Sequence, residues 1–139
     1  MQKVFTLLCF ILCFSFVSLQ ASWAQEQKPG RISLLLDGKA LDEKRQYAFD
    51  ELKGALEVTL PGEEFSKVQV YLVRGSRPVK MHTVQGNAFK DFNLYEWLMT
   101  EGKAQDGTLM PFSVARAGDR MVVLLSLNTG EKAVNISFK

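Results

Sequence analysis

Two β-strand patterns and the turn between them decide the fold class of this chain: Val68-Gln69-Val70-Tyr71-Leu72-Val73, Arg74-Gly75-Ser76-Arg77-Pro78 and residues 79–84. In the first stretch Val68, Val70 and Leu72 share one face, because successive side chains of a strand point to opposite faces. Pro78 suits the first position of the second strand, where no ladder donor is needed. These residues therefore predict two strands joined by a turn.

The two-residue period continues outward in both directions along the chain. Leu56, Val58 and Leu60 share one face of another predicted strand. Further strand patterns cover residues 32–36, 110–115, 121–127 and 134–138. The stretch 121–127 is apolar at nearly every position, which predicts a central strand covered on both faces. About seven short strands with frequent turns are typical of an Ig-like β-sandwich, which we assign to residues 32–139.

Two segments depart from the strand pattern. Residues 91–102 predict one short helix, with Asp91 or Asn93 as the N-terminal cap and Gly102 at its end. Its apolar residues recur at helical spacing: Phe92, Tyr95, Leu98 and Met99. Residues 39–54 have irregular apolar spacing, so we expect a loop with a helical turn there.

The N-terminal segment has the features of a secretion signal. Lys3 precedes an uncharged stretch over residues 4–19, and the small residues Ser22 and Ala24 follow it. We therefore expect a signal peptide over residues 1–24, cleaved after Ala24, and a flexible lead-in over residues 25–31. The alternative is a retained membrane anchor, but the apolar stretch is shorter than the about 20 residues of a spanning helix.

Export would change the composition of the mature protein. Cys9 and Cys13 lie within the predicted signal peptide, so the mature chain would have no disulfide. Small secreted eukaryotic domains usually depend on disulfides, which favours a periplasmic or cell-envelope location in a bacterium. Removing Lys3 from 17 basic residues leaves 16 against 15 acidic ones. That balance excludes the strongly basic character of a nucleic-acid-binding domain.

The sequence offers no catalytic, cofactor-binding or metal-binding constellation. His82 is the only histidine, and we expect it on the polar surface of its strand. Zinc sites and nucleophilic triads need more partners than this chain has. The adjacent acidic pairs, such as Glu63-Glu64, lack the alternating spacing of a calcium loop. A carboxylate pair distant in sequence leaves a small hydrolase as the least favoured alternative.

Four residues are candidates for binding a partner: Trp97, Tyr95, Arg74 and Arg77. Phe92 and Tyr95 are expected to cover the open end of the sandwich, while Trp97 falls off that stripe and is the better exposed anchor. The basic residues near the predicted turns form either a patch for an acidic partner or charges that discourage edge aggregation: Arg74, Arg77, Lys80, Arg116 and Arg120. We favour edge protection.

Two short motifs carry a resemblance to a known family. Residues 68–79, with the turn Arg74-Gly75-Ser76-Arg77-Pro78-Val79, and residues 117–123, with Gly118-Asp119-Arg120, resemble the C-terminal periplasmic domain of the GldM/PorM family. That family belongs to the gliding-motility and type IX secretion apparatus of Bacteroidetes. The resemblance covers roughly residues 55–139 and implies an Ig-like fold and a protein-binding role. This chain lacks the family's several domains and long helical region, so the resemblance does not imply motor activity.

The sequence therefore predicts an exported, non-enzymatic domain that binds another envelope protein without a cofactor. A surface adhesion or carbohydrate-binding module is the alternative from a different class. Membrane association is expected only if the N-terminal segment is kept as an anchor.

Overall fold

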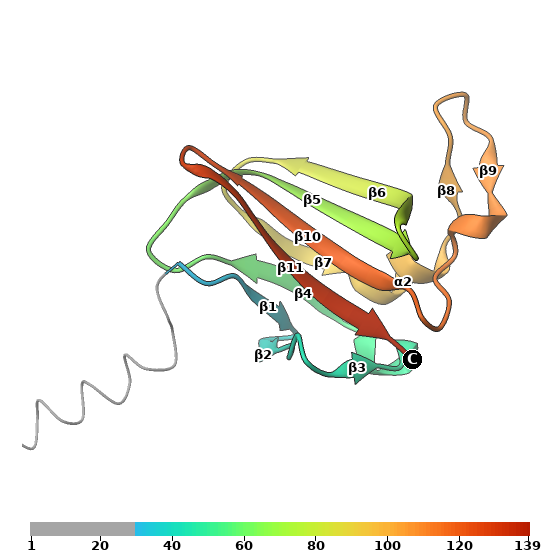
Figure 1. The fold of residues 1–139 in the computed structure, drawn as a ribbon, viewed down its shortest axis with the longest axis horizontal. Helices are drawn as coiled ribbons and strands as arrows, with labels where there is room; N and C mark the ends of the chain where they lie inside the picture. Colours follow the sequence, from blue (N-terminus) through green and yellow to red (C-terminus); the bar gives the residue numbers. More distant parts are fainter. Residues whose placement is uncertain (1–29) are drawn as a thin grey trace, which may run out of the picture.

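A computed structural model describes residues 30–139 as a sandwich of two β-sheets (Figure 1). The predicted signal peptide, its cleavage site and nearly all of the lead-in lie outside the described residues. Over residues 30–139, no helix is both long enough and apolar enough to cross a membrane.

The larger sheet has five strands in the order β3–β11–β10–β5–β6. Their bounds are β3 (Gln46–Tyr47), β5 (Phe65–Arg74), β6 (Arg77–Gln85), β10 (Arg120–Leu127) and β11 (Gly130–Phe138). All neighbours are antiparallel except β3 and β11, which run parallel. The predicted hairpin between β5 and β6 is present, with Arg74 paired to Arg77 across the turn.

The smaller sheet has four strands in the order β2–β1–β4–β7. Its strands are β1 (Ser33–Leu36), β2 (Lys39–Ala40), β4 (Ala55–Thr59) and β7 (Phe89–Asn93). A third, two-stranded sheet pairs β8 (Gly102–Lys103) with β9 (Leu109–Met110). This β8–β9 hairpin projects away from the two layers (Figure 1).

The core lies between the two layers and consists of the strand faces that the two-residue period predicts. The larger sheet contributes the fully buried Val68, Val70, Leu72, Met121, Val123, Leu125 and Ile136. The smaller sheet contributes Leu34, Leu56 and Val58. These inward faces confirm the predicted mostly β sandwich, because each sheet stabilises the other by removing its apolar face from water.

Within residues 30–139, three short helices connect the strands: η1 (Phe49–Leu52), α2 (Leu94–Met99) and η2 (Pro111–Ser113). The predicted cap of α2 is confirmed, since the Asn93 side chain accepts a hydrogen bond from the Glu96 backbone nitrogen. The predicted end at Gly102 is wrong, because α2 stops at Met99 and Gly102 belongs to β8. Leu94 and Leu98, one turn apart, form the buried stripe of α2 in place of the predicted Phe92 and Tyr95.

Other local predictions also need correction. Residues 110–115 are not a strand, because Pro111 begins η2 directly after the two-residue β9. The strand β7 was not predicted, since its buried pattern is too short to recognise. The strand β10 is central, as predicted, but Val122 and Leu124 are only half-buried on its outward face. The prediction that both faces are covered is therefore wrong.

Candidate protein-interaction surface

A clamp between Arg74 and Asp119 organises one end of the sandwich. Arg74 Nε lies 2.9 Å from Asp119 Oδ1 and its Nη2 lies 2.8 Å from Oδ2. Arg74 also donates to the backbone oxygens of Phe112, at 2.8 Å, and Val114, at 3.0 Å. A bidentate guanidinium–carboxylate pair is both strong and directional. The end of β5 thereby holds the chain that leads from η2 into β10.

Asp119 is the buried member of this clamp, with 2% of its surface exposed. Its carboxylate also accepts a hydrogen bond from the Arg116 backbone nitrogen at 2.8 Å. Hydrogen bonding to Asp119 raises the pKa of Arg74 above its already high ordinary value, so the guanidinium stays charged. Arg74 therefore has a structural role here, and its charge is neutralised by Asp119.

Lys80 reaches from β6 to the C-terminal end of α2. Its Nζ donates to the backbone oxygens of Trp97, Leu98 and Thr100, the last two at 3.4 and 2.8 Å. The same nitrogen lies 4.7 Å from the centre of the Trp97 ring. A cation is favoured at this end of a helix, where carbonyl groups lack intrahelical partners.

Lys80 is only 8% exposed. Burial lowers its pKa to about 8, because the charged ammonium loses solvation. Hydrogen bonds to the three carbonyl groups oppose this lowering of the pKa, because they stabilise the charged form of Lys80. Lys80 therefore anchors α2 to the larger sheet.

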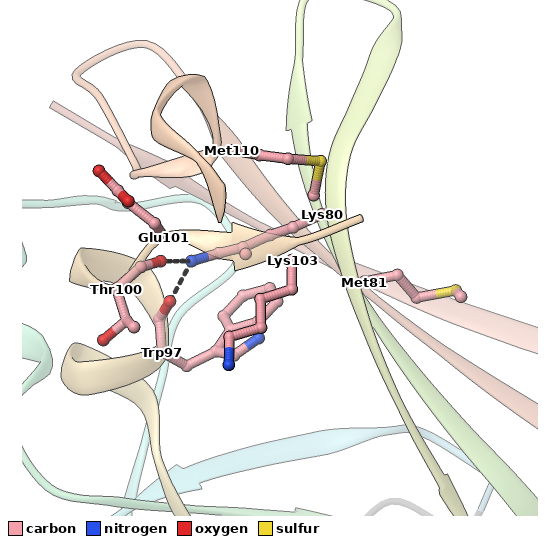
Figure 2. A pocket seen from close by; sticks show the side chains of 8 residues that line it. Lys80, Met81, Trp97, Thr100, Glu101, Lys103 and Met110 are labelled. Atoms are coloured by element: carbon pink, nitrogen blue, oxygen red, sulfur yellow. Dashed lines mark hydrogen bonds between the residues drawn. The ribbon is translucent and has the colours of Figure 1, made fainter. Parts of the chain in front are cut away.

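A shallow cleft of about 150 Å³ lies beside this contact (Figure 2). It is lined by Lys80, Met81, Trp97, Thr100, Glu101, Gly102, Lys103 and Met110. Lys80 and Met81 project to opposite sides of β6 in Figure 2. The cleft joins β6, the end of α2 and the β8–β9 hairpin into one surface, but it is too small to enclose a drug-sized ligand.

Within residues 30–139, three large apolar side chains are more than half exposed, and each lies in or next to an element that lines the cleft. Met81 on β6 and Leu109 on β9 are each 54% exposed, and Phe112 on η2 is 51% exposed. We call this set, Met81, Leu109 and Phe112, the apolar end. The sequence does not reveal this set, because residues 110–115 are predicted as a strand and Met81 belongs to the predicted strand over residues 79–84.

The four predicted binding residues do not form one patch. Arg74 is held by Asp119, while Arg77 is exposed beside it at the start of β6. Tyr95 is half-buried and its ring centre lies 5.0 Å from Lys53 Nζ. Trp97 is also half-buried and packs against the core, so the prediction that it is an exposed anchor is wrong.

Two further predictions about basic and titratable residues are corrected. Lys80 was expected to protect the sheet edge, but it points inward to α2. His82 was expected on the polar surface, yet it is half-buried and stacks on Phe92 with the ring centres 4.9 Å apart. Both residues lie on the inner face of β6, where they pair with the buried Leu72 and Val70.

Within residues 30–139, no group of histidine, cysteine, aspartate and glutamate side chains is arranged to hold a metal ion. Comparison with family models, with curated proteins and with solved structures found no match for this chain. The resemblance to the GldM/PorM family therefore stays a prediction from short sequence motifs.

Proposed function

We propose that this chain is an exported, non-enzymatic Ig-like domain that binds another protein of the bacterial cell envelope. The observation that carries the proposal is the apolar end, where Met81, Leu109 and Phe112 are each more than half exposed. Exposed apolar side chains that form one patch mark interaction sites, and the proposal takes these three, which lie in or next to elements that line the cleft, as one patch. The motif resemblance adds that the partner belongs to a type IX secretion or gliding apparatus.

The surroundings of the apolar end also favour a protein partner. Its charged neighbours include Arg77, Glu101 and Lys103, which would form the polar rim that surrounds the apolar centre of a protein interface. A carbohydrate-binding site would instead be expected to present flat aromatic rings. In the described part of the chain every tyrosine and tryptophan is buried or half-buried, and Phe112 is the one exposed aromatic ring. This weighs against the carbohydrate-binding alternative.

The proposal is tested by capture from the cell envelope of the source organism. The tagged chain should retain one envelope protein in stoichiometric amount, identified by mass spectrometry. The double variant Leu109→Asp/Phe112→Asp should lose that protein while keeping the melting temperature of the wild type. Ala133→Asp/Asn135→Asp is the matched control, because it places the same two charges on exposed sites of β11.

Two results would contradict the proposal. One is capture that is equal for the wild type and the Leu109/Phe112 double variant, since the apolar end would then have no part in binding. The other is retention of the chain on immobilised envelope glycans with no protein bound, which would support the carbohydrate-binding module instead.

A further inference from the structure

The strand β6 forms an open edge of the larger sheet. It pairs with β5 on one side, and within residues 30–139 no strand pairs with its other side. Exposed edges carry unpaired backbone groups that can pair with another chain, so natural proteins usually protect them with charges, prolines or bulges. Pro78 and a bulge near Val73 protect only the start of β6.

The basic side chains that the sequence suggested would protect the sheet edge do not protect the rest of β6, since Arg74 lies on β5 and the exposed Arg77 stands at the start of β6. Arg74 is turned to Asp119, and Lys80 is turned to the carbonyl groups of α2. His82 is stacked on Phe92. From Met81 to Gln85, the outward side chains of this edge are uncharged. This part of the edge is therefore free to accept another strand.

The ladder with β5 identifies which backbone groups are free. Gly86 donates from its backbone nitrogen to the Ser66 oxygen at 2.8 Å, one step beyond the pair formed by Lys67 and Gln85. Antiparallel strands alternate between hydrogen-bonded and non-hydrogen-bonded pairs. The backbones of Val84, His82 and Lys80 therefore face β5. Those of Met81, Thr83 and Gln85 face away from it.

The three residues with unpaired backbone groups are Met81, Thr83 and Gln85, and Thr83 lies midway between the other two. In an antiparallel pair of two β6 strands, a two-fold axis at Thr83 sets Thr83 opposite Thr83 and Met81 opposite Gln85. Every free donor and acceptor of the three residues then has a partner, and no like charges face each other. A pair centred on Met81 would instead require Val79, which lies in the bulge.

We propose that two copies of this chain associate through antiparallel β6 edges related by a two-fold axis at Thr83. The larger sheets of the two copies then form one continuous ten-stranded sheet, because each contributes five strands. The β8–β9 hairpin stands beyond the start of β6 (Figure 1), and of the three free residues only Met81 shares a cleft with it. The proposal goes beyond the proposed function, since it concerns the edge of β6, which shares only Met81 with the apolar end.

Variants that place opposite charges at Thr83 test the register in which Thr83 lies opposite Thr83 of the second copy. Sedimentation velocity over a range of concentrations should show a monomer–dimer equilibrium for the wild type. Thr83→Lys and Thr83→Glu should each weaken the dimer by up to about fivefold, because like charges directly opposite each other destabilise a strand pair. An equimolar mixture of the two variants should restore it. Thr83→Val, which keeps a β-branched side chain, is the matched control.

Thiol crosslinking gives a second readout that does not depend on affinity. With Cys9 and Cys13 replaced by Ser, Thr83→Cys chains should crosslink to each other through a short bifunctional thiol reagent. Met81→Cys alone should not crosslink, but a mixture of Met81→Cys and Gln85→Cys chains should. Circular dichroism establishes that each variant is folded before it is used.

Several outcomes would overturn the proposal. A wild-type protein that stays monomeric at every concentration rules out self-pairing. If a charge at Thr83 does not weaken the dimer, the contact lies elsewhere. The same conclusion follows if mixing the two charged variants does not restore the dimer. A monomer in which Thr83→Lys abolishes binding of another envelope protein assigns the edge to that partner. The Leu109/Phe112 double variant should dimerise like the wild type, so this test is independent of the proposed function.

Discussion

At the scale of single residues, the most constrained position is Asp119. Its buried carboxylate receives two bonds from the Arg74 guanidinium and one from the Arg116 backbone. Asp119→Ala should lower the free energy of unfolding by about 2–4 kcal/mol, because it leaves the Arg74 charge without its partner. Urea denaturation measures this, with Glu131→Ala, at an exposed site, as the control. A loss no larger than that of the control would contradict the clamp.

Lys80 gives a prediction about pH. Its pKa in the folded protein is about 8, below the ordinary 10.5 of the unfolded chain. Between these two values the unfolded state binds more protons, so stability should rise with pH over that range. The gain is at most about 3 kcal/mol, since each pKa unit corresponds to about 1.4 kcal/mol.

The contribution of Lys80 is isolated by comparing unfolding free energies of the wild type and Lys80→Met from pH 7 to 10.5. The stability of the wild type relative to the variant should increase with pH. Lys103→Met, an exposed lysine of the same cleft, is the control. The difference in unfolding free energy between the wild type and Lys80→Met could instead stay constant or fall over this range. That result would show that the three carbonyl groups stabilise the charged form of Lys80 by more than its burial destabilises it.

At the scale of elements, the β8–β9 hairpin is separable from the core. Its paired residues are exposed or half-buried, and Ser113 holds its base by accepting a bond from Gly102 and donating one to Met110. Replacing residues 105–107 with Asn-Gly should leave the melting temperature within a few degrees of the wild type, because this turn suits a two-residue hairpin between Ala104 and Thr108, which form a hydrogen-bonded pair. Loss of cooperative thermal unfolding in calorimetry would show that the hairpin is needed for folding.

The same scale shows how far the sequence predicts this structure. Long strands such as β5, β10 and β11 are predictable, because their alternation extends over enough residues to define a buried face. The β8–β9 hairpin is not, since its two-residue strands have no period. The roles of Lys80 and Asp119 are also not predictable, because their partners are distant in sequence and are set by tertiary packing.

The candidate site is predictable only in part. Sequence reasoning named Arg74 and Arg77 as candidates for binding a partner. It did not name Met81, Leu109 or Phe112. An exposed apolar side chain cannot be distinguished from a core residue by composition alone, because both satisfy the same apolar pattern. The direction in which each side chain points follows from the register with the neighbouring strand, and that register was unknown from the sequence.

At the scale of the whole molecule, stability should not depend on disulfides. Residues 30–139 contain no cysteine, so the sandwich is held by its buried apolar faces and by contacts such as the Arg74–Asp119 clamp. If the chain is exported and cleaved after Ala24, the mature protein also lacks Cys9 and Cys13. A reducing agent should therefore leave its melting temperature unchanged, which differential scanning fluorimetry can measure.

Export itself is tested by the intact mass of the protein recovered from the source organism. Cleavage after Ala24 predicts a mass that begins at Gln25, because Ser22 and Ala24 supply the small residues before the cut. Ala24→Arg should block cleavage and cause the full-length chain to accumulate with the membrane, whereas the conservative Ala24→Ser should be processed normally. A full-length wild-type chain in the membrane fraction would show that the segment is kept as an anchor. Pairing of two β6 edges would then be confined to the membrane surface, where tethering raises the effective concentration of the two copies.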